Sequence, residues 1–310
     1  MLDRVVVSNK PNRFREGLLL GIGAYLIWGL VTLFWKQLVD FQPGELIGWR
    51  ISMSFLTLAI LMLWRGGIHS VALGFRAKRT RGLVIVAALV VVVNWSSYIL
   101  AVVHDHLLEA ALGYFLSPLG TVTLGVLVMG EKLRSLQYLI LALATSAIVV
   151  ISVSYGQVPW IALLIAGSWS VYSLIKRQLT VPAVESLAME MVVLVFPAIA
   201  LVVVLSPNTD SVWHVAGAWQ WVLIVLTGPV TVAPLWMFGA AAQRLPMTQL
   251  GPLQYIVPVI NFLLGWLVYD EAVTVATFAG FALIWLALVV LALDLGNETR
   301  KRAKPDSIRL

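Results

Sequence analysis

The stretch LLEAALGYFLSPLGTVTLGVLVMGE, residues Leu107 to Glu131, is apolar enough to lie in lipid, yet it has an acid near each end and a proline in its middle. A second stretch of equal length, MTQLGPLQYIVPVINFLLGWLVYDE, begins 140 residues later at Met247. The shared register pairs Pro118 with Pro258 and Glu131 with Glu271. The chain therefore contains an internal repeat of a membrane-compatible helix.

The composition places the whole chain in a bilayer. Of 310 residues, 60% are hydrophobic and only 12% are charged, and the mean hydropathy is +0.93. A helix needs about 20 apolar residues to cross a hydrocarbon layer of about 30 Å. We therefore predict an all-α membrane protein with ten transmembrane helices, at 17–39, 43–64, 82–103, 107–129, 135–154, 158–178, 183–205, 217–241, 247–269 and 273–294.

The repeat extends beyond the two quoted stretches. The offset of 140 also pairs Glu45 with Glu185, and an offset of 141 pairs Trp28 with Trp169. Each half then has five helices, and an odd number makes the second half enter the membrane from the opposite side. We predict two inverted repeats, 17–154 and 155–294, between terminal tails 1–16 and 295–310. Inverted repeats are common in secondary transporters, and some channels have them too.

The basic residues give an orientation. If the N-terminus is cytoplasmic, 19 of the 21 lysines and arginines fall in cytoplasmic segments, and the exceptions are Lys36 and Arg50. The positive-inside rule explains this bias, so the net charge of +6 requires no nucleic-acid partner. We expect a multi-pass protein of the cytoplasmic membrane with both termini cytoplasmic. Its first apolar segment is longer than a signal peptide and is interpreted as a retained helix.

Two charges lie inside predicted spans at equivalent positions, because Arg50 plus 140 is Glu190. Each lies about seven residues from a helix end, which corresponds to a depth of about 10 Å. An unpaired charge in lipid is unfavourable, so each side chain should face the protein interior or a wet cavity. Neighbouring groups could satisfy both charges. Alternatively, Arg50 binds an anionic group or forms a gate, and Glu190 couples protons or binds a cation.

Polar residues follow one face of both quoted helices. The spacing of Glu109, Gly113, Ser117 and Thr121 places them on one face, which should line a cavity or pack closely against another helix. The other helix has a comparable stripe. Each proline should kink its helix and free a carbonyl four residues earlier. The second stripe consists of Gln254, Pro258 and Asn261 with Tyr255 beside it, and the freed carbonyls are those of Tyr114 and Gln254.

Other features decide less. Four tryptophans lie deep in predicted spans, where they either pack in the core or form a cavity wall. The deep tryptophans are Trp28, Trp95, Trp169 and Trp236.

The tract His104–His106 suits a solvated turn better than a metal site, because no further ligands accompany it. Cysteine is absent, and no catalytic or nucleotide-binding motif is present, so we expect no cofactor and no enzyme activity.

Several segments are similar to those of RarD proteins, in the EamA branch of the drug/metabolite transporter superfamily. These segments are YLIWGLVTLFWK, PGELIGWR, NWSSYILAVVHDHLLEAALGYFLSPL, GEKL and GPLQYIVPVI. The resemblance covers about residues 14–294 and implies a ten-helix transporter of two EamA repeats. Ser117 departs from the asparagine of the family pattern. The matched candidates for cavity and gates are Trp28, Lys36, Glu45, Arg50, Asn94, Glu109, Tyr114, Glu190, Gln254 and Tyr255.

We therefore predict a secondary transporter for a small organic metabolite or drug-like molecule, with alternating access of the two repeats. Glu109 and Glu190 would tune charge or carry protons. Trp28, Tyr114, Gln254 and Tyr255 would shape the wall, and Ser117, Trp169 and Asn261 would also line the cavity. Pro118 and Pro258 would bend the helices. The two segments 135–154 and 273–294 would be outer supports or a homodimer surface. The alternatives are an intramembrane enzyme for a lipid-linked substrate and a scaffold that transports nothing.

Overall fold

A computed structural model describes residues 10–103, 106–153, 160–270 and 275–303, and these residues form helices and connectors without a strand. Eight described helices are long and apolar enough to cross a membrane, and Ser135–Ser146 is a shorter apolar helical segment. The elements are α1 (Lys10–Trp35), η1 (Lys36–Leu38), α2 (Pro43–Arg65), α3 (Ile68–Arg76), α4 (Lys78–Val103), α5 (Leu107–Leu127), α6 (Ser135–Val153), α7 (Trp160–Gln178), α8 (Ala183–Leu205), α9 (Val212–Val215), α10 (Ala218–Ala242), α11 (Met247–Leu253), α12 (Ile256–Val268) and α13 (Val275–Ala303).

Helices occupy the described part of all ten predicted segments, but two of them do not count among the eight spans. In α6 the apolar stretch Ser135–Ser146 is too short to count as a span. In α7 the polar side chains of three serines, Lys176 and Arg177 lower the hydropathy of the helix. The buried polar residues Ser170, Ser173 and Lys176 face the protein interior, while Leu163 and Leu164 of the same helix are exposed.

The two helices quoted at the start differ in the structure. Although each was expected to be one kinked helix, α5 continues through Pro118, whereas its equivalent breaks into α11 and α12. At the break, the Gln254 N–H donates to the Gly251 carbonyl at 2.9 Å and the Tyr255 N–H to the Pro252 carbonyl at 3.2 Å. The second stretch has Pro252 as well as Pro258, and two missing donors six residues apart favour this tighter turn.

The predicted connector between residues 65 and 81 is also partly helical. Gly66 ends α2 in the left-handed conformation, with a φ of 67°, which glycine adopts without a steric penalty. The helix α3 follows directly and packs against α8. The connector therefore covers one side of the bundle instead of extending into solvent.

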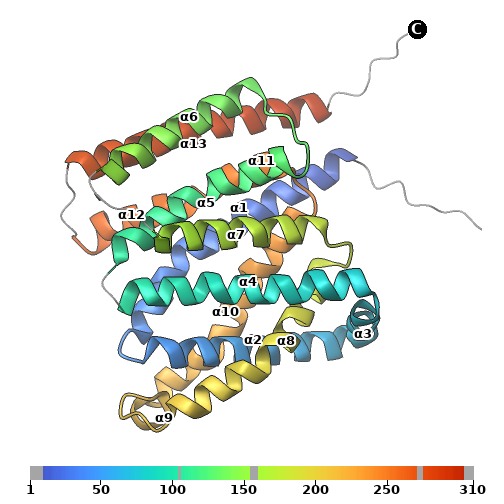
Figure 1. The fold of residues 1–310 in the computed structure, drawn as a ribbon, viewed down its shortest axis with the longest axis vertical. Helices are drawn as coiled ribbons and strands as arrows, with labels where there is room; N and C mark the ends of the chain where they lie inside the picture. The colour runs from blue at the N-terminus through green and yellow to red at the C-terminus, as the bar shows by residue number, and fades with distance from the viewer. Residues whose placement is uncertain (1–9, 104–105, 154–159, 271–274, 304–310) are drawn as a thin grey trace, which may run out of the picture.

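The helix pairs follow the repeat. The equivalent helices α2 and α8 pack together, and so do α6 and α13, at opposite ends of the view in Figure 1. The pair α4 and α7 is equivalent to the pair α10 and α1, and both pairs are in close contact. The beginning of α1 and the end of α13 lie on the same side of the bundle, as an even number of crossings requires (Figure 1).

Small residues allow α2 and α8 to approach closely. A Cβ atom added to Gly48 would lie 2.9 Å from the Ala198 carbonyl oxygen and 2.6 Å from a Val202 methyl group. Small residues at such crossings are the usual means by which transmembrane helices associate. The start of α2 lies beside the end of α8, since Gly44 faces Leu205, so the two helices are antiparallel.

Candidate functional site

Arg50 lies half-buried on α2, among neutral groups from three other elements. Its Nε donates a hydrogen bond to Thr231 Oγ1 on α10 at 2.9 Å. Its guanidinium carbon lies 4.3 Å from the centroid of the Trp95 ring and 5.2 Å from that of Trp35. Aromatic faces attract a cation but leave its charge unneutralised. Because the described neighbours of Arg50 are neutral, its guanidinium can still bind an anion.

Tyr114 lies near Arg50, and Tyr98 packs against Tyr114. Tyr98 on α4 and Tyr114 on α5 have ring centroids 6.0 Å apart, and they are 42% and 40% exposed. The neutral hydroxyl group of Tyr114 lies near the Arg50 guanidinium. We call the end of the bundle that contains Arg50 and these tyrosines the Arg50 end. It combines a cation with partly exposed aromatic rings.

Glu190 on α8 lies in a different environment, with no exposed surface. Its Oε1 accepts from Lys176 Nζ at 2.5 Å, and its Oε2 accepts from the Tyr172 hydroxyl at 2.9 Å. Lys176 Nζ also donates to Ser186 Oγ at 2.9 Å. We call the opposite end of the bundle, which contains this buried ion pair, the Glu190 end. Arg50 and Glu190 therefore have different described partners.

Lys176 corrects one sequence-based assignment. We counted it among the basic residues of cytoplasmic segments, but its side chain lies inside the bundle with 1% exposure. Helix α7 continues for two residues beyond it, and α8 begins at Ala183, so the ammonium group can reach Glu190 fourteen positions later. Sequence position alone gave no reason to separate Lys176 from its neighbour Arg177.

An aromatic cluster fills the bundle beside this ion pair. Trp28 and Trp169, which the repeat pairs with each other, are in contact, with ring centroids 5.3 Å apart. Phe238 on α10 packs against both rings and against Tyr172, whose centroid lies 6.0 Å away. Such tilted and edge-on pairs stabilise a packed core. The two predicted wall tryptophans therefore meet near the axis that relates the repeats.

Some equivalent positions differ in exposure between the two ends. In three pairs separated by 140 residues, the member in the first repeat is accessible and the member in the second is buried. Tyr98 is 42% exposed and Phe238 0%, Tyr114 is 40% exposed and Gln254 5%, and Arg50 is half-buried while Glu190 is 0% exposed. At these three pairs of positions, the residue at the Glu190 end is buried and the residue at the Arg50 end is partly exposed.

Other predicted cavity residues join helices to one another. Asn94 Nδ2 on α4 donates to the Ile165 carbonyl of α7 at 2.9 Å. Gln254 Nε2 donates to Thr121 Oγ1 at 2.9 Å, and the Tyr255 hydroxyl donates to the Phe115 carbonyl at 3.3 Å. All three side chains are buried. Their present role is to hold helices together.

The polar stripe of α5 packs closely against α7, which is one of its two expected environments. A Cβ atom at Gly113 would lie 3.0 Å from the Ala162 carbonyl oxygen. Ser117 donates to the Gly113 carbonyl at 2.8 Å, and its own carbonyl accepts from Ser170 Oγ at 3.2 Å. Hydroxyl groups thus satisfy the polar backbone along this interface.

The predicted gating acids and Lys36 lie near helix ends. Glu45 is buried and accepts from Trp49 Nε1 at 3.1 Å, Ser211 Oγ at 3.1 Å and the Val212 N–H at 3.0 Å, which fixes α9 on α2. This pair reverses the exposure pattern, because Glu185 is only half-buried. Lys36 is exposed, with its Nζ 3.0 Å from the Tyr269 ring centroid.

Glu131 caps the helix that repeats its own. Its two carboxylate oxygens accept from the Met247 N–H at 2.9 Å and the Thr248 N–H at 2.8 Å, at the positive start of α11. Asn261 Oδ1 accepts from Thr32 Oγ1 at 2.9 Å near the Arg50 end. The side chain of Glu109, all of Glu271 and residues 104–105 lie outside the described structure.

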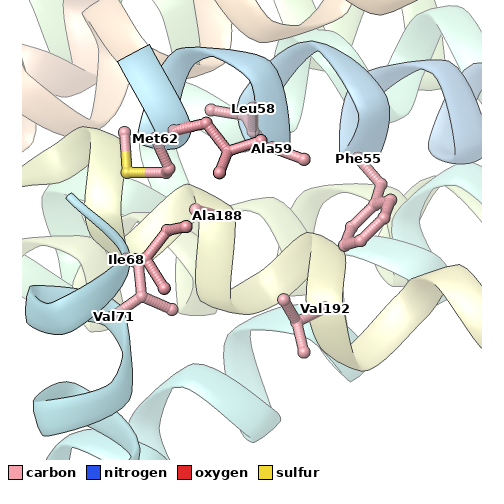
Figure 2. A pocket seen from close by; sticks show the side chains of 9 residues that line it. Phe55, Leu58, Ala59, Met62, Ile68, Val71, Ala188 and Val192 are labelled. Atoms are coloured by element: carbon pink, nitrogen blue, oxygen red, sulfur yellow. The ribbon is translucent and has the colours of Figure 1, made fainter. Parts of the chain in front are cut away.

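One pocket lies apart from these residues, between α2, α3 and α8 (Figure 2). Its volume is about 220 Å³, and its nine lining residues, which include Phe55, Met62 and Val192, are all apolar. It has no group that could orient a polar ligand. Among the described residues, no group of three histidines or acids could hold a metal ion.

The comparisons with known proteins agree with this fold. The model of the EamA-like transporter family matches residues 15–153 and again 158–293. The chain therefore belongs to this family, and it is a multi-pass membrane protein and a membrane transporter.

Within the family, the chain is similar to RarD proteins, as the sequence segments indicated. It is 43% identical to Protein RarD of Streptomyces exfoliatus, over 94% of this chain and 93% of the relative. It is 37% identical to an uncharacterized transporter of Vibrio cholerae, over 90% and 93%. It is 32% identical to Protein RarD of Escherichia coli, over 94% and 98%. A crystal structure with 24% identity shares the fold, with a TM-score of 0.67 over 90% of this chain and 98% of that one.

Sequence reasoning missed five residues of the site, all supplied by other helices. Lys176 and Tyr172 bind Glu190, and Thr231 accepts a hydrogen bond from Arg50. Tyr98 packs against Tyr114, and Phe238 joins the aromatic cluster. The repeat held one usable signal, because Phe238 is Tyr98 plus 140. The repeat places aromatic residues at the equivalent positions 98 and 238, just as it places charges at 50 and 190, so it could have predicted both Tyr98 and Phe238 as site residues.

Proposed function

We propose that the protein is a secondary transporter in which two inverted five-helix repeats alternately open the Arg50 end and the Glu190 end. The observation that supports this proposal is the opposite exposure of equivalent positions, such as Tyr98 and Phe238. Two repeats with the same fold can exchange conformations, so the mirror state should expose Phe238 and bury Tyr98. The cargo is a small organic molecule that fits between aromatic walls beside Arg50.

The orientation follows from the distribution of basic residues. Ten spans with both termini in the cytoplasm place the basic residues that flank α3 on the inside, in the cytoplasmic membrane. The Arg50 end then faces outward, and the Glu190 end faces the cytoplasm. In this arrangement the structure corresponds to an outward-open state. The outer pair α6 and α13 is the surface we assign to support or to a homodimer contact.

We assign Glu190 to closing the inner end, in place of the expected proton transfer. Its carboxylate pairs with Lys176 and accepts from Tyr172, so all three groups are satisfied inside the bundle. A buried ion pair of this kind fixes one arrangement of helices, because separating its members leaves each charge without a partner. This role belongs to a transporter and involves no catalytic step.

Two single-cysteine variants test the proposal, since the natural chain has no cysteine. Tyr98→Cys and Phe238→Cys are placed separately in liposomes and treated with a membrane-impermeant maleimide from each side. We expect Tyr98→Cys to react from the outside, and Phe238→Cys to react only from the inside and more slowly. A condition that shifts the equilibrium should change the two rates in opposite directions. Rates that always rise and fall together would contradict alternating access.

A further inference from the structure

The residues beside Arg50 and Glu190 differ in one decisive way. Glu190 contacts Lys176, which has the opposite charge. Under the offset of 141 that aligns α1 with α7, the equivalent of Lys176 is Trp35, and Trp35 is the ring that lies 5.2 Å from Arg50. The same structural contact is an ion pair in one repeat and a cation on a neutral ring in the other.

Closing the Arg50 end would therefore bury a charge that this contact does not neutralise. The Glu190 end shows what closure does, because Glu190 and Lys176 have lost nearly all contact with solvent. A hydrogen bond to Thr231 and the faces of Trp95 and Trp35 would remain with Arg50. These groups leave its net charge of one in place, and a buried cation without a counter-ion is strongly unfavourable.

We propose that the Arg50 end closes only around a bound organic anion, whose carboxylate or phosphate group pairs with Arg50. This inference rests on the proposed alternating access. It adds the class of substrate and the requirement that the protein without substrate keeps its Arg50 end open. Without an anion the Arg50 end stays open, so the transporter exchanges one anion for another and does not return empty. The rings of Trp95 and Tyr114 favour anions with a flat apolar body.

Glu109 is the intramembrane acid of the first repeat that could replace the anion. It lies in the first turn of α5, and its side chain is outside the described structure. If its carboxylate neutralised Arg50, the open end would close without cargo. The variant Glu109→Gln therefore belongs in the test.

The decisive measurement follows the maleimide reactivity of Tyr98→Cys in liposomes without any added ligand. Replacing Arg50 by Gln in this background removes the charge, so the end closes while empty. We expect the maleimide reaction rate to fall by about tenfold or more, because the closed state hides position 98. A tenfold change in the open population corresponds to about 1.4 kcal/mol. Arg50→Lys keeps the charge and should keep the high rate. An unchanged rate in Arg50→Gln would overturn the inference.

Two matched probes test the anion itself. Phenylacetate should lower the rate for Tyr98→Cys and raise the rate for Phe238→Cys from the other face, whereas the neutral phenylacetamide should change neither. An equal response to both compounds would contradict the inference. The rise at Phe238→Cys excludes simple shielding of Tyr98→Cys by the ligand.

The remaining outcomes separate this inference from the proposed function. If the rates for Tyr98→Cys and Phe238→Cys never change in opposite directions, alternating access itself fails. If they do, but Arg50→Gln leaves the ligand-free rates unchanged, only the requirement for an anion fails. We expect Glu109→Gln to leave the ligand-free rate for Tyr98→Cys unchanged. An increase would show that the chain supplies its own counter-charge, which also overturns the inference.

Discussion

The two ends of this transporter are built from equivalent positions and differ in what surrounds them. At the Glu190 end, a carboxylate, an ammonium group and a tyrosine hydroxyl satisfy one another inside packed helices. At the Arg50 end, a cation lies against aromatic rings and a threonine, beside tyrosines that are about two-fifths exposed. The first arrangement pairs opposite charges, whereas the described groups around the cation in the second are neutral. Four pairs of substitutions sharpen or break this comparison.

The largest difference should separate the two charged positions. Glu190→Gln leaves Lys176 buried without a carboxylate, and we expect a loss of about 3–5 kcal/mol of stability. Arg50→Gln removes a half-buried charge and should change stability by less than about 1 kcal/mol. Unfolding in detergent, followed by circular dichroism, measures both. The double variant Lys176→Met with Glu190→Gln should recover part of the loss, and no recovery would contradict a paired role.

The aromatic positions should differ less. Phe238 is fully buried and touches four rings, so Phe238→Leu should cost about 1–2 kcal/mol through lost ring contacts. Tyr98→Leu at the equivalent exposed position should cost less than about 0.5 kcal/mol. The same unfolding measurement applies. Equal losses would mean that both ends are packed alike.

A smaller difference is expected between Gln254 and Tyr114. Gln254→Leu removes the hydrogen bond to Thr121 between buried helices, and we expect a loss of about 1–2 kcal/mol. Tyr114→Phe removes only a hydroxyl from a partly exposed ring and should change stability by less than about 0.5 kcal/mol. Thermal unfolding of both variants checks this order. A larger effect of Tyr114→Phe would place its hydroxyl in the packed interior.

The smallest effect should come from an ion pair at the surface of the closed end. Arg244 contacts Glu16 at 3.3 Å, and both side chains are partly exposed. Each single substitution to Gln should cost less than about 0.3 kcal/mol, and a double-mutant cycle should give a similarly small coupling. A coupling as large as that of Lys176 and Glu190 would show that surface pairs also hold this end closed.

The sequence was sufficient wherever a feature depended on local chemistry. Hydropathy located the helices, and the register of Pro118 with Pro258 revealed the repeat, because a membrane requires long apolar helices and a duplicated segment keeps its spacing. It also singled out Arg50 and Glu190, since charges inside predicted spans need a reason. The break between α11 and α12, which α5 lacks, goes with Pro252, a second proline six residues before Pro258.

Partners and exposure were decided only by the tertiary structure. Lys176 looked like a residue of a cytoplasmic segment until α7 and α8 brought it to Glu190, and Gln254 looked like a cavity residue until α5 covered it. Two repeats with the same pattern can be packed open at either end, and sequence alone does not choose between them. The long-range contacts decide this, and they make one equivalent position a buried ion pair and the other a half-buried cation beside aromatic rings.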